Sequence, residues 1–189
     1  MPSSDGPGEE LIRQLRAAHW ALAEQMRASW NRDLPFPELI GDRWDRARRL
    51  GFGEGTSIYD SSHVFGDVRV GRHTWIGPFT LLDGSGGLEI GDYCSISTGV
   101  QIYSHDTVDW AVSGGVAAYE HAPTRIESRC YLGAQTVVAK GVTIGEGSIV
   151  GACSFVHSDV PAGSIAVGTP ARVIGSVEFD GERVVRRYR

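Results

Sequence analysis

The sequence has 189 residues, which suits one medium-sized domain with some appended structure and excludes two large domains. Hydrophobic residues form 41% of the chain, so it can bury a core, and the net charge of −5 argues against a large phosphate-binding surface for nucleic acid. The 25 glycines are nearly twice the usual share of about 7%, and no collagen-like period or low-complexity run accounts for them.

The first residues show no basic stretch followed by an apolar one, so the sequence predicts no signal peptide. No uncharged run approaches the ~18 apolar residues that a membrane span needs. The three cysteines, Cys94, Cys130 and Cys153, are widely spaced and predict neither a disulfide framework nor a cysteine zinc site. We therefore expect a cytoplasmic protein without a membrane span.

Residues 1–52 are predicted to form a helical region. An amphipathic helix is expected over residues 9–31, because apolar side chains recur there at helical spacing, at Leu11, Leu15, Ala18, Leu22 and Met26. Pro35 and Pro37 end this helix, and a second short helix is expected over 37–49. We expect the helices to cap the next element or to pack on a neighbouring subunit.

Aliphatic residues then recur every six positions, with one two-residue slip. The register runs through Ile58, Val64, Val70, Ile76, Leu82, Ile90, Ile96, Ile102, Ile126, Leu132, Val138, Ile144, Val150 and Val156. A helix cannot keep such residues on one face, because six residues rotate by about 600°. Strands of a β-sandwich do not keep this register either, whereas short strands joined by corners do.

The pattern therefore predicts an all-β solenoid of about five coils over residues 53–175, with ~18 residues in each coil. The position four residues after each aliphatic residue is small or β-branched, except at Asp106, and should fit beside it in the interior. Glycine follows the aliphatic residue in six repeats, where we expect it to permit tight turning of the backbone at corners.

The six-residue register fails between Ile102 and Ile126, so residues 103–125 should leave the solenoid as a loop. Loops of this length are usually functional. Polar and aromatic side chains concentrate in it, namely Tyr103, His105, Asp106, Asp109, Trp110, Tyr119, Glu120 and His121. His105 stands at the root of the loop, where an imidazole can accept a proton from a hydroxyl or an amine near neutral pH.

The other loop residues have two interpretations each. Asp106 or Asp109 would orient the imidazole or cap the loop, and Trp110 would form an apolar wall for a ligand or anchor the loop by packing. Asp83 lies just before the slip in the register. This break would either open space for an acceptor or result from the geometry of a corner. Beyond the solenoid, residues 176–189 predict a terminal hairpin around an Asp-Gly turn.

The repeat over about residues 55–175 resembles that of the hexapeptide-repeat acyltransferases, the left-handed parallel β-helix family. This resemblance implies a left-handed solenoid, a homotrimer, His105 as the catalytic base, and acetyl-CoA as the acyl donor with no metal required. Tyr103, Tyr119 and His121 would then support the base or line the acceptor site.

The C-terminal coils resemble the coenzyme A segment of that family. Gly133, Ala134 and Ala152 would lie along the pantetheine arm, where their small size permits close approach. Arg172 would meet the phosphates of the coenzyme. The family commonly has Thr-Lys where this chain has His157-Ser158, so these two residues would also lie in the coenzyme site, and phosphate binding would depend on Arg172 and Lys140.

Residues 44–60 and 100–110 resemble the sugar O-acetyltransferases of surface-polysaccharide and lipopolysaccharide assembly. The resemblance implies acetyl-CoA-dependent O-acetylation of a carbohydrate. N-acetylation of an amino sugar, often nucleotide-linked, is the first alternative, and an antibiotic acceptor is another. A non-catalytic solenoid scaffold would leave the loop unexplained, and a γ-type carbonic anhydrase would need histidines five residues apart, which the sequence lacks.

Overall fold

The computed structural model of the chain describes residues 7–181 and 183–189. It divides into two compact units, Met1–Asp42 and Arg43–Arg189. In the described part of the chain, no helix combines the length and the apolar character needed to cross a membrane.

The first unit holds two helices. The predicted amphipathic helix is present as α1 (Pro7–Trp30), with acidic residues in its first turn and Arg27 in its last, as the helix dipole favours. The helix predicted over 37–49 is two helices, α2 (Phe36–Ile40) and α3 (Arg43–Arg49), because Gly41 adopts an extended conformation between them. Phe36 of α2 contacts His19 of α1, with ring centroids 5.2 Å apart.

Helix α3 belongs to the second unit, so the division falls inside the predicted helical region. Its Ala47 is buried, and its Arg46 donates hydrogen bonds to the carbonyls of Tyr59 and Ser62 in the first turn of the strands that follow.

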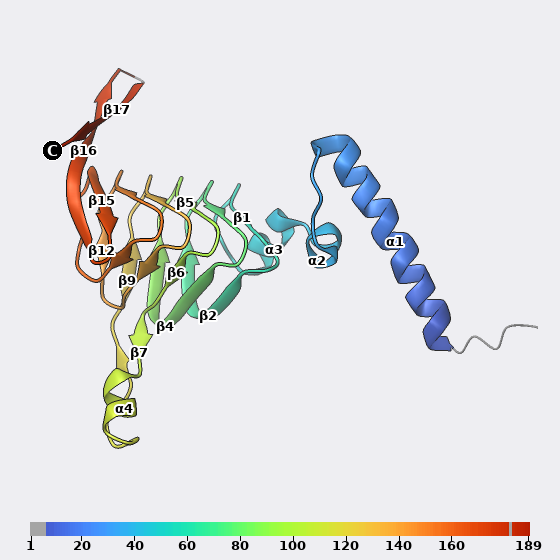
Figure 1. Cartoon of the computed structure of the whole chain (residues 1–189), viewed down its shortest axis with the longest axis horizontal. Coiled ribbons are helices and arrows are strands. Elements are labelled where there is room, and N and C mark those ends of the chain that lie inside the picture. Colours follow the sequence, from blue (N-terminus) through green and yellow to red (C-terminus); the bar gives the residue numbers. More distant parts are fainter. Residues whose placement is uncertain (1–6, 182) are drawn as a thin grey trace, which may run out of the picture. The chain divides into compact units, whose positions relative to one another are not determined.

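The predicted β-solenoid is confirmed, and it has six turns rather than five, since six parallel strands stack on its first side (Figure 1). These strands are β1 (Ser57–Ile58), β3 (Trp75–Ile76), β5 (Ser95–Ile96), β10 (Tyr131–Leu132), β13 (Ile149–Val150) and β15 (Ser164–Gly168). The second side holds the first residues of β2 (His63–Val70) and β4 (Leu81–Ile90), then β6 (Gln101–Ile102), β11 (Val137–Val138) and β14 (Phe155–Val156). The third side holds the last residues of β2 and β4, then β9 (Thr124–Ile126) and β12 (Thr143–Ile144), and it ends at the bridge from Ile144 to Val160.

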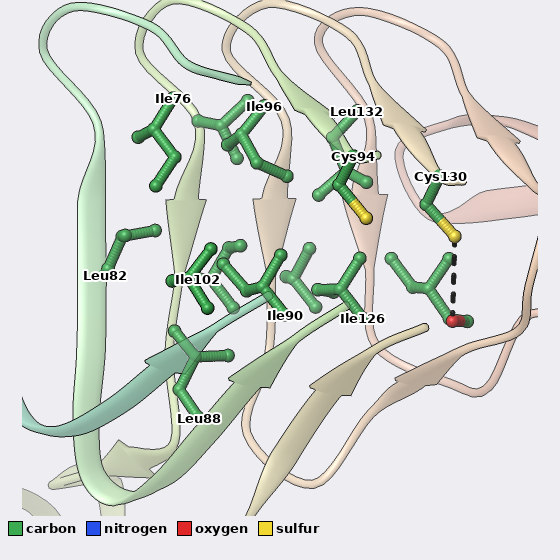
Figure 2. Close-up of a cluster of buried hydrophobic side chains, with 14 of the residues drawn as sticks. Ile76, Leu82, Leu88, Ile90, Cys94, Ile96, Ile102, Ile126, Cys130 and Leu132 are labelled. Carbon is green, nitrogen blue, oxygen red and sulfur yellow. Dashed lines mark hydrogen bonds between the residues drawn. The ribbon is translucent and has the colours of Figure 1, made fainter. Parts of the chain in front are cut away.

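The aliphatic register forms the core. Each of these side chains lies above its counterpart in the previous turn, as in the pairs Ile76 with Ile96 and Leu82 with Ile102, and all four are fully buried (Figure 2). Most of the small residues four positions later are buried as well, and several of their hydroxyls donate to corner carbonyls, as Thr136 does to Gly151 and Ser148 to Pro161. These hydroxyls satisfy backbone groups that the corners leave without strand partners.

The glycines that follow the aliphatic residues serve close stacking and not backbone turning, so the expectation for them was wrong. A Cβ atom on Gly133 would lie 2.4 Å from the amide nitrogen of Ala152 in the next turn, and a Cβ on Gly145 would lie 2.4 Å from that of Ala162. The left-handed corner positions hold other residues, including His73 and Tyr93.

Two elements interrupt or extend the solenoid. The loop leaves after β6 and contains β7 (His105–Asp106), α4 (Val108–Val112) and β8 (Glu120–His121), and it projects from the solenoid in Figure 1. The predicted C-terminal hairpin is present as β16 (Ala171–Asp180) and β17 (Arg183–Tyr188), whose strands pair antiparallel.

Candidate active site

The candidate site lies at the corner between the second and third sides, where the loop leaves the solenoid. Leu82 of β4 pairs with Ile102 of β6, so the residues after Leu82 lie under the root of the loop. The amide of Gly86 donates to the Ser104 hydroxyl over 2.8 Å, and a Cβ atom on Gly86 would lie 2.2 Å from the Ser104 carbonyl oxygen. Only glycine permits so close an approach, which explains the glycine-rich slip in the register.

Asp83 is buried at this corner, with a side chain that is 2% exposed. Its Oδ1 accepts hydrogen bonds from the Ser85 amide (3.0 Å) and hydroxyl (2.6 Å), and its Oδ2 accepts one from the Ser104 amide (3.0 Å). Burial raises the pKa of Asp83, but the hydrogen bonds from Ser85, Ser104 and His105 outweigh burial and hold the pKa well below its usual range. The corner therefore carries a buried, ionised carboxylate.

His105 completes this group. Its Nδ1 lies 2.6 Å from Oδ2 of Asp83. Because an ionised carboxylate is only an acceptor, Nδ1 carries the proton in this contact. A neutral imidazole in this tautomer has its lone pair on Nε2, where it can accept a proton, and the His105 side chain is 30% exposed.

The residue that holds the imidazole is Asp83, so of the two interpretations left open for Asp106 and Asp109, neither residue orients the ring in this structure. Asp106 accepts a hydrogen bond from the Val108 amide at the start of α4, which is the capping role, and Asp109 lies in the first turn of that helix. The six-residue register of the sequence could have identified Asp83. It pairs Leu82 with Ile102, so the residues that follow Leu82 lie next to those that follow Ile102.

The loop begins and ends as a two-stranded ribbon. Strands β7 and β8 pair antiparallel, with His105 opposite His121 and Asp106 opposite Glu120. The rings of His105 and His121 stack with centroids 5.8 Å apart, so the structure brings these two predicted site residues together. Farther out, the rings of Trp110 and Tyr119 meet edge to face, with centroids 5.6 Å apart.

Below the ribbon, the two legs of the loop are bonded to each other. The Ala122 amide donates to the Ser104 carbonyl over 2.9 Å, and the Thr124 hydroxyl donates to the Tyr103 carbonyl over 2.6 Å. The Tyr103 hydroxyl in turn donates to the Gln101 side chain over 2.7 Å. These contacts hold the root of the loop as part of the solenoid wall.

Lys140 has a different contact from the one expected. Its Nζ lies 2.5 Å from Oδ2 of Asp106 and 2.7 Å from Oε2 of Glu120. Hydrogen bonds to Asp106 and then Glu120 raise the pKa of Lys140, and the bond from Lys140 is the largest of the effects that lower the pKa of Asp106. In this structure, the Lys140 ammonium is bound to the two carboxylates at the base of the loop.

The other residues assigned to the coenzyme lie at several places. Gly133, Ala134 and Ala152 lie together at the corner between the first and second sides, where the Cys153 amide donates to the Ala134 carbonyl over 2.9 Å. His157 and Ser158 are exposed after β14, at the same corner column as His105. Arg172 is exposed on β16, and its guanidinium donates to the Ala171 carbonyl over 2.9 Å.

A hollow of about 620 Å³ lies elsewhere, on the third side, and His105 does not line it. Some of its charged side chains pair with one another, as Arg125 does with Glu89 over 2.9 Å. We place the candidate site at His105 because the bonded pair of a histidine and a buried carboxylate lies there. Among the residues that the structure describes, no group of three or more His, Cys, Asp or Glu side chains is placed to hold a metal ion.

On this parallel β-solenoid, a buried carboxylate orients a loop histidine. The imidazole of that histidine can accept a proton from a ligand. Residues 123–158 match the family described as bacterial transferase hexapeptide (six repeats). Over these residues, the chain is similar to the hexapeptide-repeat transferases.

Among curated proteins, the chain is similar to a 2,3,4,5-tetrahydropyridine-2,6-dicarboxylate N-acetyltransferase of Clostridium perfringens, with 45% identity over 67 residues. This match spans 35% of the chain and only 28% of the relative.

Two solved structures share the fold. The hexapeptide-repeat containing acetyltransferase VCA0836 from Vibrio cholerae is 23% identical, with a TM-score of 0.54 over 87% of this chain and 92% of that one. A variant of AntD, an N-acyltransferase from Bacillus cereus, in complex with dTDP-4-amino-4,6-dideoxyglucose and coenzyme A, is 21% identical. Its TM-score is 0.60 over 70% of this chain and 87% of that one.

The substitution Asp83→Asn tests the state of the buried carboxylate. Asp83 has a lowered pKa in the folded protein, so its ionised form stabilises the fold fully above the unfolded pKa of about 3.9. That contribution is lost as the pH falls toward the folded pKa. The stability difference between wild type and Asp83→Asn should shrink below pH 4, by up to about 1.4 kcal/mol per pH unit.

Urea denaturation between pH 3 and 7 measures this difference. Asp67→Asn is the matched control, because Asp67 is an exposed carboxylate at the same corner one turn earlier. It should change stability little at any pH. A difference for Asp83→Asn that stays the same down to pH 3 would contradict the ionised state.

Proposed function

We propose that this chain is an acetyl-CoA-dependent acetyltransferase in which His105 is the general base. The observation that carries the proposal is the 2.6 Å contact between His105 Nδ1 and the buried Asp83 carboxylate. This contact leaves Nε2 as the acceptor, at the root of a long loop. The acetyltransferase names of the relatives support the same reaction class.

The chemistry follows from this geometry. Acetyl-CoA supplies the acetyl group as a thioester. His105 Nε2 takes the proton of the acceptor as its oxygen or nitrogen attacks the acetyl carbonyl, and the ionised Asp83 stabilises the imidazolium that forms. When the carbon–sulfur bond breaks, the imidazolium returns the proton to the departing sulfur, so the base is regenerated in one direct transfer.

Replacing the base tests the proposal. His105→Ala should lower turnover by ~10²–10⁴, the usual contribution of a general base, because the variant lacks the imidazole that Asp83 orients. Coenzyme A binding, followed by thermal shift, should stay as in the wild type. His73→Ala is the control, since His73 is an exposed histidine that stacks on Tyr93 at another corner. Wild-type turnover in His105→Ala would refute the assignment.

The proposed coenzyme site is the group of small residues Gly133, Ala134 and Ala152, of which Gly133 is buried, together with the exposed Arg172. These residues fit a coenzyme in two respects. Ala134 and Ala152 are accessible and offer no bulky side chain to a pantetheine arm, and the only partner of the Arg172 guanidinium in the described residues is a backbone carbonyl. The guanidinium is therefore available to phosphate oxygens.

Arg172→Ala should raise the KM for acetyl-CoA several-fold with little change in kcat, because a phosphate contact distant from the thioester contributes to binding alone. Steady-state kinetics with varied acetyl-CoA measure this. Arg69→Ala, which removes an exposed arginine on the third side, should leave the KM unchanged. An unchanged KM in Arg172→Ala would remove this residue from the coenzyme site.

For the acceptor, we propose a carbohydrate hydroxyl. Trp110 and Tyr119 support this choice, because these aromatic residues of the loop are 42% and 48% exposed, and aromatic rings stack on sugar rings. N-acetylation of an amino sugar is the second candidate, since the relative from Clostridium and AntD are both named as acting on nitrogen.

An acceptor panel decides between the two candidates. Radiolabelled acetyl-CoA is offered with free sugars, amino sugars and nucleotide-linked amino sugars, and each product is treated with mild base, which cleaves esters and leaves amides. We expect base-labile label on a sugar hydroxyl. Base-stable label confined to amino sugars would overturn O-acetylation in favour of the second candidate.

A further inference from the structure

The ribbon at the base of the loop has two different faces. Neighbouring cross-strand pairs of a two-stranded ribbon point to opposite sides. The pair His105 and His121 lies on one side, and the pair Asp106 and Glu120 lies on the other. The first pair stacks its rings, and the second pair binds Lys140 from the solenoid.

Lys140 belongs to the turn of the solenoid that follows the loop. Val138 pairs with Ile102, so the segment after Val138 lies directly over the root of the loop. The Tyr103 amide donates to the Val138 carbonyl over 3.0 Å, and the Gly141 amide donates to the Thr124 hydroxyl over 3.0 Å. The backbone on either side of Lys140 is thus bonded to both legs of the loop.

The ribbon needs such a contact. A two-stranded ribbon of two residue pairs is marginally stable by itself in water. Its Asp106 and Glu120 lie directly opposite each other, and like charges in such a pair are destabilising. The Lys140 ammonium bridges the two carboxylates, so it converts their repulsion into an attachment to the solenoid. Its side chain is 22% exposed, which limits screening by solvent.

We propose that Lys140 is a positioning residue: by binding the Asp106 and Glu120 face of the ribbon, it holds the opposite face so that His105 meets both Asp83 and the acceptor. The inference rests on the proposed function for its effect on turnover. It assigns Lys140 to the base of the loop instead of the coenzyme phosphates, and the two roles make different kinetic predictions.

Lys140→Met keeps the length and the apolar stem of the side chain and removes its charge. If Lys140 positions His105, kcat should fall about 10- to 100-fold, because a misplacement near 1 Å at a reacting group can cost that much. The KM for acetyl-CoA should not change. Lys140→Arg keeps a cation within reach of both carboxylates and should recover most of the turnover.

Hydrogen–deuterium exchange followed by mass spectrometry supplies a readout without activity. In Lys140→Met, peptides covering residues 103–121 should exchange at least tenfold faster, while peptides covering 131–138 exchange as in the wild type. Arg125→Met is the matched control, because it removes a cation from another pair between turns, the pair with Glu89. It should change neither the loop exchange nor kcat.

The outcomes separate the possibilities. Faster loop exchange together with a lower kcat at constant KM supports the positioning role. Unchanged loop exchange overturns it, and so does faster exchange with unaltered turnover. A raised KM for acetyl-CoA with unchanged exchange would indicate that Lys140 binds the coenzyme phosphates. If the wild type acetylates no acceptor, the proposed function fails, while the exchange measurement still decides whether Lys140 fastens the loop.

Discussion

The structure depends on the stacking of successive turns in register. Each core residue lies above its counterpart in the previous turn, as Ile76, Ile96 and Leu132 do on the first side. Stacked strands are ~4.8 Å apart, so residues that the sequence separates by a full turn are direct neighbours. This constraint requires a small residue at each position where the turns approach most closely, and it determines which polar groups meet at the corners.

The candidate site is a consequence of the same stacking. Three successive turns contribute one group each: Asp83 from the turn below, His105 from the turn that extrudes the loop, and Lys140 from the turn above. The carboxylate is buried and bonded to serine donors, so its position is set by the solenoid wall. The loop can therefore project from the solenoid while its first residues stay ordered.

Much of the fold could be predicted from the sequence, because the six-residue period has a direct physical cause in the interior of a solenoid. The same period located the loop, and with it His105. Contacts between turns were harder to predict. The partner of His105 precedes it by 22 residues across a register slip, whereas the sequence offered Asp106 and Asp109 close by as candidates either to orient the ring or to cap the loop. The role of Lys140 depends on two carboxylates that become neighbours only when β7 pairs with β8. The glycines after the aliphatic residues were expected to permit tight turning at corners, because the sequence shows the residue type but not the distance to the next turn.

The central claim is that Asp83 fixes the tautomer of His105 and leaves Nε2 as the proton acceptor. Long-range ¹H–¹⁵N correlation spectra of the wild-type protein test this most directly, with the His105 signals assigned by their absence in His105→Gln. The contact predicts that the neutral imidazole carries its proton on Nδ1 and has an unprotonated Nε2, and that Asp83→Asn removes this preference. A neutral His105 with its proton on Nε2 in the wild type would contradict the account.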